Sequence, residues 1–399
     1  MRITNITARS IPDTRGRPTI ETTLSTQQGS TLCATASVPS GKSTGKSEAF
    51  EMDAALAISN INEEVSVTLA ERDFNSPDEL DSFLIELDGT ENKSRLGANA
   101  ILSVSVAAMR LFALQDGELL WRAIAKRAGT TPSAPRLFVN VMNGGIHAGF
   151  KLPFQEYILV VEGKTSSALL IAQKAFTKLG ELLTTEGRLA SLTMGDEGGY
   201  APTFDTLEQP FEILEKLVKE SPSTSIAIDA AASQLFHEGA YNILGKEYSV
   251  DDLAKTYANL VKSFDVRSIE DPFDENAIDD FVRLTSAVDE RLLIVGDDLT
   301  CSNPKLISDA VINKAVNAII IKPNQIGTVM EAIESVKIAQ SAGLRVIASH
   351  RSGETDDTFI ADFAYGIGAY GIKAGGLGQK ERVEKYDRLL AIEREAEMI

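Results

Sequence analysis

Residues 266–298 read VRSIEDPFDENAIDDFVRLTSAVDERLLIVGDD, and this stretch decides the fold class. Two short apolar strands end on acidic residues, Glu270 and Asp297, and enclose an amphipathic segment of helix length. The two acidic ends are 27 residues apart, about one strand-plus-helix unit of a parallel barrel. The stretch therefore predicts a repeating β/α unit.

The same unit recurs on both sides of this stretch. SIAIDA ends at Asp229, and after Asp297 the strands NAIIIKP, RVIASH and YGIKAG end at Lys322, His350 and Lys373, in steps of 25, 28 and 23 residues. The longer gap after Asp229 leaves room for an extra hairpin or loop at residues 242–248. We predict an α/β fold, a (β/α)8 barrel of the TIM type, over residues 136–399.

The N-terminal third has a different pattern. Residues 1 to about 125 mix short β-rich stretches with helical ones, and in the helix expected at 99–114 apolar and small residues occupy nearly every side. The stretch KRAGTTPSAPRL, residues 126–137, is typical of a linker. We therefore predict an α+β domain over residues 1–135 and a barrel domain over 136–399.

Composition limits the function classes. The net charge of −18 argues against nucleic acid and anionic membranes as partners, and an anionic substrate would need cations placed locally in its pocket. The N-terminus lacks a signal-peptide pattern, and no run of eighteen apolar residues without charge predicts a membrane span. Cys33 and Cys301 do not form a disulfide framework. We expect a cytoplasmic protein.

The polar strand ends of a barrel converge on one mouth. A single charged residue at a strand end is usually just solvated, but six in register indicate a site. Asp229, Glu270 and Asp297 offer only hard oxygen ligands, which favours Mg²⁺. Lys322 and Lys373 end neighbouring units, so we expect both ammonium groups to lie near the metals with a lowered pKa, and one of them to act as a base.

Three further segments carry chemistry. NGGIHAGFKLPFQE contains His147 and ends at Glu156, and MGDEGGYAP places glycines around Glu197; each is typical of a loop over a site, although an ordinary turn is the commoner explanation of either alone. SHRSGE offers Arg351 and Ser352 to a phosphate or carboxylate. His237, in LFHEGAY, is expected in an exposed turn.

The run SGKSTG at residues 40–45 contains GKST, the ending of a phosphate-binding P-loop. The first glycine of that motif would fall at Ala36, and Pro39 lies within the loop. A nucleotide-hydrolysing enzyme is therefore disfavoured, and ATP binding would discriminate.

The chain resembles the enolase family from end to end. The segments that carry the resemblance are RGRPT (15–19), PSGKSTG (39–45), GTENKSRLGANAILSVS (89–105), NGGIHAG, FQE, GDEGG, SIEDP, GDDLT, KPNQIGT and SHRSGETDDTFIAD. The resemblance implies an enolase-type (β/α)8 barrel with an α+β N-terminal domain. It also implies the reversible dehydration of 2-phospho-D-glycerate to phosphoenolpyruvate, with two Mg²⁺ per active site.

Residue roles follow from the resemblance. Asp229, Glu270 and Asp297 would hold one Mg²⁺. Ser43, on a mobile loop at 36–46, would bind the second together with the phosphate. Lys322 resembles the base at C2 and Glu197 the acid at C3. The remaining site residues, which would bind substrate or complete the catalytic set, are His147, Gln155, Glu156, His350, Arg351, Ser352 and Lys373.

The chain departs from the family pattern at four places. Lys42 stands where enolases commonly have alanine, FKLP at 150–153 replaces a smaller stretch, Gln379 replaces an arginine, and Ala391 replaces an arginine that bridges subunits in many enolases. The resemblance still implies a homodimer or a dimer-based oligomer. A non-catalytic relative, or a superfamily member acting on another carboxylate, are the alternatives.

Overall fold

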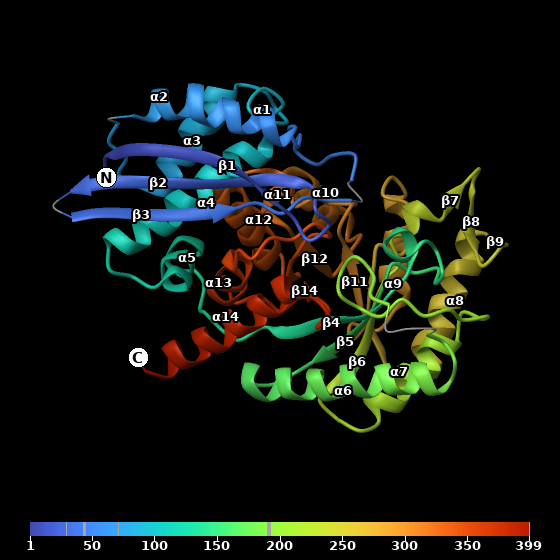
Figure 1. Cartoon of the computed structure of the whole chain (residues 1–399). Coiled ribbons are helices and arrows are strands. Elements are labelled where there is room, and N and C mark those ends of the chain that lie inside the picture. Colours follow the sequence, from blue (N-terminus) through green and yellow to red (C-terminus); the bar gives the residue numbers. More distant parts are fainter. Residues whose placement is uncertain (29, 43–44, 71, 190–192, 399) are drawn as a thin grey trace.

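The computed structural model describes residues 1–28, 30–42, 45–70, 72–189 and 193–398. The N-terminal part begins with an antiparallel sheet of three strands, β1 (Ile3–Pro12), β2 (Pro18–Gln28) and β3 (Ser30–Ser37). Helices follow along the chain: α1 (Ala54–Ser59), α2 (Ser66–Leu69), α3 (Pro77–Asp88), α4 (Ala98–Gln115) and α5 (Leu120–Ala128). In Figure 1 the sheet and these helices form one lobe beside the barrel.

Helix α4 is the centre of this lobe. It packs against β2 and β3 on one side and against α3 on another, which is why its sequence is small and apolar nearly all round, as predicted. The helix is long and apolar enough to cross a bilayer, but 83% of that window is buried inside the protein. Its composition is therefore that of a core helix.

The second part is a closed barrel, as predicted. Its strands lie in the order β10-β11-β12-β13-β14-β4-β5-β6. Their bounds are β4 (Arg136–Asn143), β5 (Glu156–Val161), β6 (Thr224–Asp229), β10 (Val266–Glu270), β11 (Leu293–Gly296), β12 (Ala318–Ile321), β13 (Arg345–Ser349) and β14 (Gly371–Gly375). The family-level expectation of an eight-stranded barrel is confirmed.

One strand breaks the expected all-parallel pattern. β5 pairs antiparallel with both β4 and β6, and it follows β4 without an intervening α-helix. A strand that runs backwards begins at the mouth where its neighbours end. Glu156, the first residue of β5, consequently lies opposite Asp229, the last residue of β6.

Helices surround the barrel. They are α6 (Thr165–Thr185), α7 (Gln209–Val218), α8 (Val250–Ser263), α9 (Ile278–Ala287), α10 (Pro304–Asn313), α12 (Val329–Ser341), α13 (Phe359–Gly366) and α14 (Lys380–Glu397), with a short α11 (Pro323–Ile326) after β12. The expected extra hairpin exists as β7 (Phe236–His237), β8 (Ala240–Ile243) and β9 (Lys246–Tyr248). It projects at the right of Figure 1, and His237 on it is exposed as predicted.

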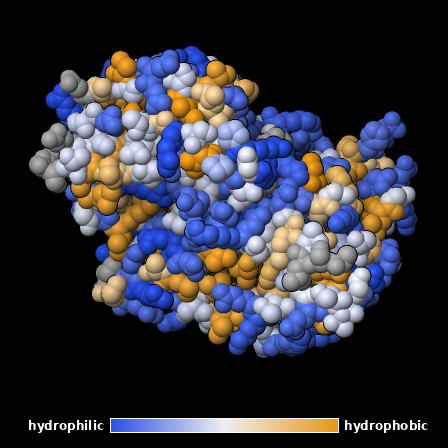
Figure 2. Space-filling view, in the orientation of Figure 1, coloured by the Kyte–Doolittle hydropathy of each residue, from blue (hydrophilic) through white to orange (hydrophobic). Residues whose placement is uncertain are grey.

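Residues 129–135 connect α5 to β4, so the predicted linker is shorter at both ends than the sequence suggested. The domain boundary at residue 135 remains a prediction. The barrel interior is filled by apolar side chains such as Phe138, Ile158, Val295 and Ile320. The face seen in Figure 2 is largely hydrophilic with scattered apolar residues, in keeping with the high charge of the chain.

Candidate active site

The polar strand ends meet at the mouth of the barrel. Among the described residues, one cavity there is lined almost entirely by residues that the sequence analysis placed in the site: Gln155, Glu156, Glu197, Asp229, Lys322, His350, Arg351, Ser352 and Lys373, together with Ser349. Glu270 and Asp297 lie next to this cavity, because each forms an ion pair with one of its lysines.

Lys373 is the hub of the acidic cluster. Its Nζ lies 2.9 Å from Glu156 Oε1, 3.0 Å from Asp229 Oδ2 and 2.8 Å from Glu270 Oε2. Burial alone would lower the pKa of the ammonium group, but the charges of Asp229, Glu156 and Glu270 outweigh burial and raise it well above its usual value.

Lys322 follows β12 and forms a close ion pair with Asp297, which follows β11. Burial opposes the charged lysine, yet the carboxylate of Asp297 raises the pKa of Lys322. Burial likewise raises the pKa of Asp297, but Lys322 and Lys373 lower it overall. In the protein chain by itself, the pKa of both lysines is raised, because both ammonium groups neutralise buried acids; the lowered lysine pKa expected near bound metal ions stays a prediction.

Negative charge at the mouth exceeds what these lysines balance. Burial raises the pKa of Glu270 well above its ordinary value, and Asp229 adds to the effect. The pKa of Glu156 is raised in the same way, by burial first and then by Glu197. Among the described atoms, Glu156 Oε2 is buried without a hydrogen-bond partner. A bound cation would resolve this excess.

Two groups of described residues bring potential metal ligands within 4.8 Å of one another, Asp271 with Asp297 and Asp298, and Glu156 with Glu197 and His350. The predicted triad of Asp229, Glu270 and Asp297 is not one of these groups, because Lys373 lies between its first two carboxylates and Lys322 pairs with the third. The donors at the mouth are nevertheless mainly carboxylate oxygens, which fit a hard divalent cation.

Sequence reasoning missed the part played by Asp271. Its Oδ1 accepts the Asp297 backbone N–H at 2.9 Å and its Oδ2 accepts that of Asp298 at 2.8 Å, so it holds the turn after β11. The sequence feature that could have identified Asp271 is its position directly after Glu270, at the end of the strand. Burial raises the pKa of Asp271 well above normal and that of Asp298 to about 8.

Glu197 lies on a turn and His147 in the short 3-10 helix Gly145–Ala148, both in connections between the larger elements. His147 Nε2 is 3.5 Å from Glu197 Oε1. Asn140 and Asn143, which the sequence analysis did not single out, each donate to Glu197 Oε2 at 3.2 Å. Although burial raises the pKa of Glu197, the charges of His147, Arg382 and Lys373 lower it below its ordinary value.

The corner of the site that contains Arg351 and Ser352 is built on the turn after β13. Arg351 forms an ion pair of 2.9 Å with Glu48, a residue that the sequence reasoning also missed. Arg382, which is fully buried, reaches His350 Nδ1 and donates to the Ser352 carbonyl at 3.0 Å. Burial and the nearby charge of Arg382 push the pKa of His350 well below its normal value, so this imidazole is neutral.

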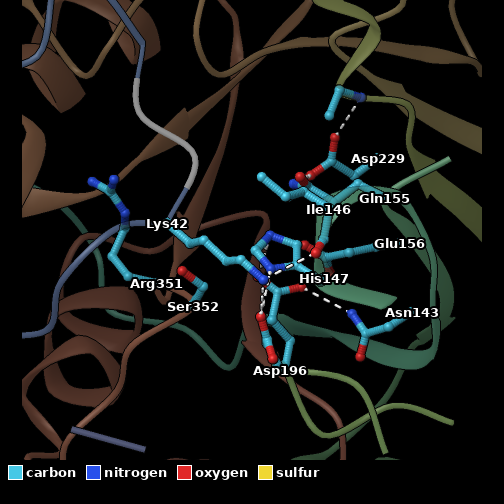
Figure 3. Close-up of polar contacts among 12 residues, drawn as sticks. Lys42, Asn143, Ile146, His147, Gln155, Glu156, Asp196, Asp229, Arg351 and Ser352 are labelled. Atoms are coloured by element: carbon cyan, nitrogen blue, oxygen red, sulfur yellow. Dashed lines mark hydrogen bonds and ion pairs between the residues drawn. The ribbon is translucent and has the colours of Figure 1, made fainter. Parts of the chain in front are cut away.

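The segment at 39–45 is the remaining sequence-predicted feature. Ser43 lies outside the described residues, as does part of the loop predicted at 36–46. The P-loop interpretation fails on its structural context, because the first helix after this segment begins only at Ala54. Lys42 is described: its Nζ lies 2.6 Å from Asp196 Oδ2 (Figure 3).

Comparisons with known proteins agree with this geometry. The family described as "Enolase, N-terminal domain" matches residues 3–124, and "Enolase, C-terminal TIM barrel domain" matches residues 132–398. The chain belongs to the enolase family. Enolase of Methanopyrus kandleri is 39% identical over 414 aligned residues that cover 98% of this chain and 95% of the relative, and Enolase B of Dictyostelium discoideum is 38% identical over 428, covering 100% and 96%. Family membership makes the protein a lyase with enolase function.

Proposed function

We propose that the site described above dehydrates 2-phospho-D-glycerate reversibly to phosphoenolpyruvate, with Lys322 as the base at C2 and Glu197 as the acid at C3. The observation that carries the proposal is that an amine, directly after β12, and a carboxyl group, on the turn between α6 and α7, line the same small cavity. Elimination needs such a pair, because one group removes a proton while the other assists the departing hydroxide.

The substrate carries a phosphate and a carboxylate, and the cavity offers a cation for each. We assign the substrate carboxylate to the Lys373 ammonium and the phosphate to Arg351 with Ser352, all three of which line the cavity. His147, Gln155, Glu156 and His350 would complete the pocket. Local cations of this kind are what a chain with a net charge of −18 needs for an anionic substrate.

We assign the metal-binding role to Asp229, Glu270 and Asp297, and propose two Mg²⁺ per site, with Ser43 as a ligand of the second. When bound, these ions stabilise the negative charge that develops as C2 loses its proton. A cation held by Asp297 would offset the charge that raises the pKa of Lys322, and the Lys322 amine would then serve as the base.

Glu197 must carry a proton to act as an acid. Its own pKa is lowered, whereas that of neighbouring Glu156 is raised by burial and by the charge of Glu197. The two carboxyl groups lie close together, and we propose that Glu197 takes up a proton within this pair before it acts as the acid. We also propose a reducing, cytoplasmic setting, since the two cysteines are free thiols.

The experiment separates the two halves of the reaction by NMR of 2-phosphoglycerate in D₂O with Mg²⁺. Lys322→Ala should lose both dehydration and exchange of the C2 hydrogen, because no group remains to take the proton. Glu197→Gln should still exchange the C2 hydrogen while dehydrating roughly 10²–10⁴-fold more slowly.

Lys305→Ala, on the exposed side of α10, is the matched control and should behave as the unmodified chain. If exchange of the C2 hydrogen persists in Lys322→Ala, Lys322 is not the base, and Lys373 becomes the next candidate. No phosphoenolpyruvate from the unmodified chain with Mg²⁺ would refute the proposed function itself.

A further inference from the structure

Lys42 links three segments of the chain that surround the active site. Two residues before it, Ser40 exchanges both backbone hydrogen bonds with Gly353, at 2.8 and 2.9 Å, so the segment is anchored on the turn that carries Arg351 and Ser352. From there the Lys42 side chain reaches across the site and donates to the Ile146 carbonyl at 2.9 Å and to Asp196 Oδ2 at 2.6 Å (Figure 3).

Both acceptors are direct neighbours of site residues. Ile146 precedes His147 in the short turn Gly145–Ala148, and Asp196 precedes Glu197 in the GDEGG turn. The two turns also touch through the Asp196 N–H and the His147 carbonyl, 3.3 Å apart. Backbone hydrogen bonds hold the GDEGG segment, including one of 2.7 Å from the Gly376 N–H to the Glu197 carbonyl. The Lys42 contacts add a further constraint, on the Asp196 side chain and on the Ile146 carbonyl.

The same oxygen of Asp196 lies near two nitrogen atoms, one from Lys42 and one from His147. Asp196 Oδ2 is 2.6 Å from Lys42 Nζ and 3.5 Å from His147 Nδ1, while the other ring nitrogen, Nε2, is 3.5 Å from Glu197 Oε1. Among the described atoms, neither nitrogen of this buried imidazole has a hydrogen bond. The ring lies between two carboxylates, and each of its nitrogen atoms faces one of them.

We propose that Lys42 is a positioning residue of this active site, which fixes Asp196 and the Ile146 carbonyl and thereby orients His147 and Glu197 for the step at C3. The inference rests on the proposed function for the identity of that step. Lys42 touches no reacting atom itself. Its effect passes through Asp196, whose pKa His147 and Lys42 together lower to about 2, against the opposing effect of burial.

An ordinary surface ion pair is the competing explanation, since the Lys42 and Asp196 side chains are 27% and 32% exposed. Such a pair contributes little to folding. The two explanations differ in what they predict for the chemistry: a surface pair leaves every rate unchanged, whereas loss of a positioning contact slows one step selectively.

The test uses Lys42→Met, which keeps the aliphatic stem and removes the ammonium group. Lys46→Met is the matched control, because Lys46 lies in the same segment and pairs instead with Glu275 at 3.4 Å. We expect Lys42→Met to lower kcat for dehydration about 10-fold with little change in KM, as small misplacements of catalytic groups do. C2 hydrogen exchange should stay close to that of the unmodified chain, since Lys322 is untouched.

Two further variants show whether the effect passes through Asp196. Lys42→Arg should recover most of the rate, and the double variant Lys42→Met/Asp196→Asn should be no slower than Asp196→Asn alone. Dehydration by Lys42→Met within 2-fold of the unmodified chain, equal slowing of C2 exchange, or effects that multiply in the double variant would each overturn the proposal.

A readout that needs no activity separates this inference from the proposed function. The chain has only three histidines, so the ¹⁵N imidazole signals of His147 are identifiable with His147→Gln as the assignment control. Lys42→Met should shift these signals and Lys46→Met should not. Unchanged His147 signals in Lys42→Met would overturn the inference even if the unmodified chain proved fully active.

Discussion

At the scale of single residues, the site balances several buried carboxylates with two lysines. Lys373 contacts three acids at once, and Lys322 one. Removing an ion-pair partner from such a place leaves an uncompensated buried charge, which costs far more than a surface pair contributes. The carboxylates of this cluster would fit a hard divalent cation, and with one bound they would be less dependent on the two lysines for charge balance.

The first prediction concerns the metal that these acids are proposed to bind. Chelation of divalent cations should abolish phosphoenolpyruvate formation, and added Mg²⁺ should restore it. In calorimetric titration with Mg²⁺, Asp229→Asn and Asp297→Asn should each weaken binding by at least the 10–100-fold that follows loss of a supporting partner. Full activity in excess chelator would contradict the assignment.

A matched variant decides between the two possible ligand sets. Asp298→Asn removes a member of the Asp271–Asp297–Asp298 group but none of the proposed triad. We expect it to bind Mg²⁺ more tightly than Asp229→Asn does. The reverse order of Mg²⁺ affinities would indicate that the Asp271–Asp297–Asp298 group binds the metal. Asp289→Asn, where the carboxylate is exposed and paired with Arg291, should bind as the unmodified chain does.

At the scale of elements, the sequence was informative where a strand end carries a polar residue. Asp229, Glu270, Asp297, Lys322 and Lys373 all lie at or directly after the strands that their spacing predicted. The direction of β5 was not predictable in this way. All six residues of β5 are buried, and a fully buried strand gives the same apolar run whichever way it points.

The sequence also did not predict the residues that support the site by contacting another site residue. Asn140 and Asn143 lie on β4 and hold Glu197, but an asparagine inside an apolar strand shows no spacing that names its partner, 57 residues away in one case. Glu48 and Arg382 lie far in sequence from Arg351 and His350, which they contact. Only the tertiary fold brings such pairs together.

A buried acid between two helices gives an element-scale prediction. Asp81 on α3 accepts the backbone N–H of Met330, at the start of α12, at 3.0 Å. Burial raises its pKa to about 7. The protonated form is therefore favoured by folding, and its contribution to stability is present below the unfolded pKa of about 4 and is lost as the pH rises through about 7.

Asp81→Asn keeps the acceptor and removes the ionisation. The variant should gain melting temperature relative to the unmodified chain, and the gain should be larger at pH 8 than at pH 5, as measured by scanning calorimetry. Three pKa units correspond to at most about 4 kcal/mol. Asp78→Asn on the same helix, a half-exposed carboxylate paired with Arg127, is the control. A gain that is equal at both pH values would contradict the prediction.

At the scale of the whole molecule, the site depends on both parts of the chain. Glu48 and Lys42 precede α1, in the N-terminal lobe, yet they contact Arg351 and Asp196 at the barrel mouth. The barrel and the N-terminal α+β part followed from the pattern of strands and from the resemblance. How the two parts meet did not, because none of these long-range ion pairs leaves a local signal in the sequence.

Assembly is the remaining whole-molecule prediction. The resemblance implies a dimer, and Ala391, on α14, stands where many relatives have an arginine that bridges subunits. One surface ion pair contributes about 0–1 kcal/mol, so its loss should loosen the dimer without abolishing it. We expect light scattering at micromolar concentration to give roughly twice the 43.0 kDa of one chain.

The net charge of the chain predicts how dimer formation depends on salt. Two chains of net charge −18 repel each other, and salt screens that repulsion, with a Debye length of about 10 Å at 0.1 M. Association should therefore tighten as salt rises from low to moderate concentration, whereas a dimer held mainly by ion pairs would loosen.

The variant Ala391→Arg should tighten the dimer by up to about 5-fold at low salt and by less at high salt, because the added ion pair is screened by salt. A species of one chain mass across the micromolar range at moderate salt would count against the dimer, and Ala391→Arg would then show whether the missing arginine is the reason.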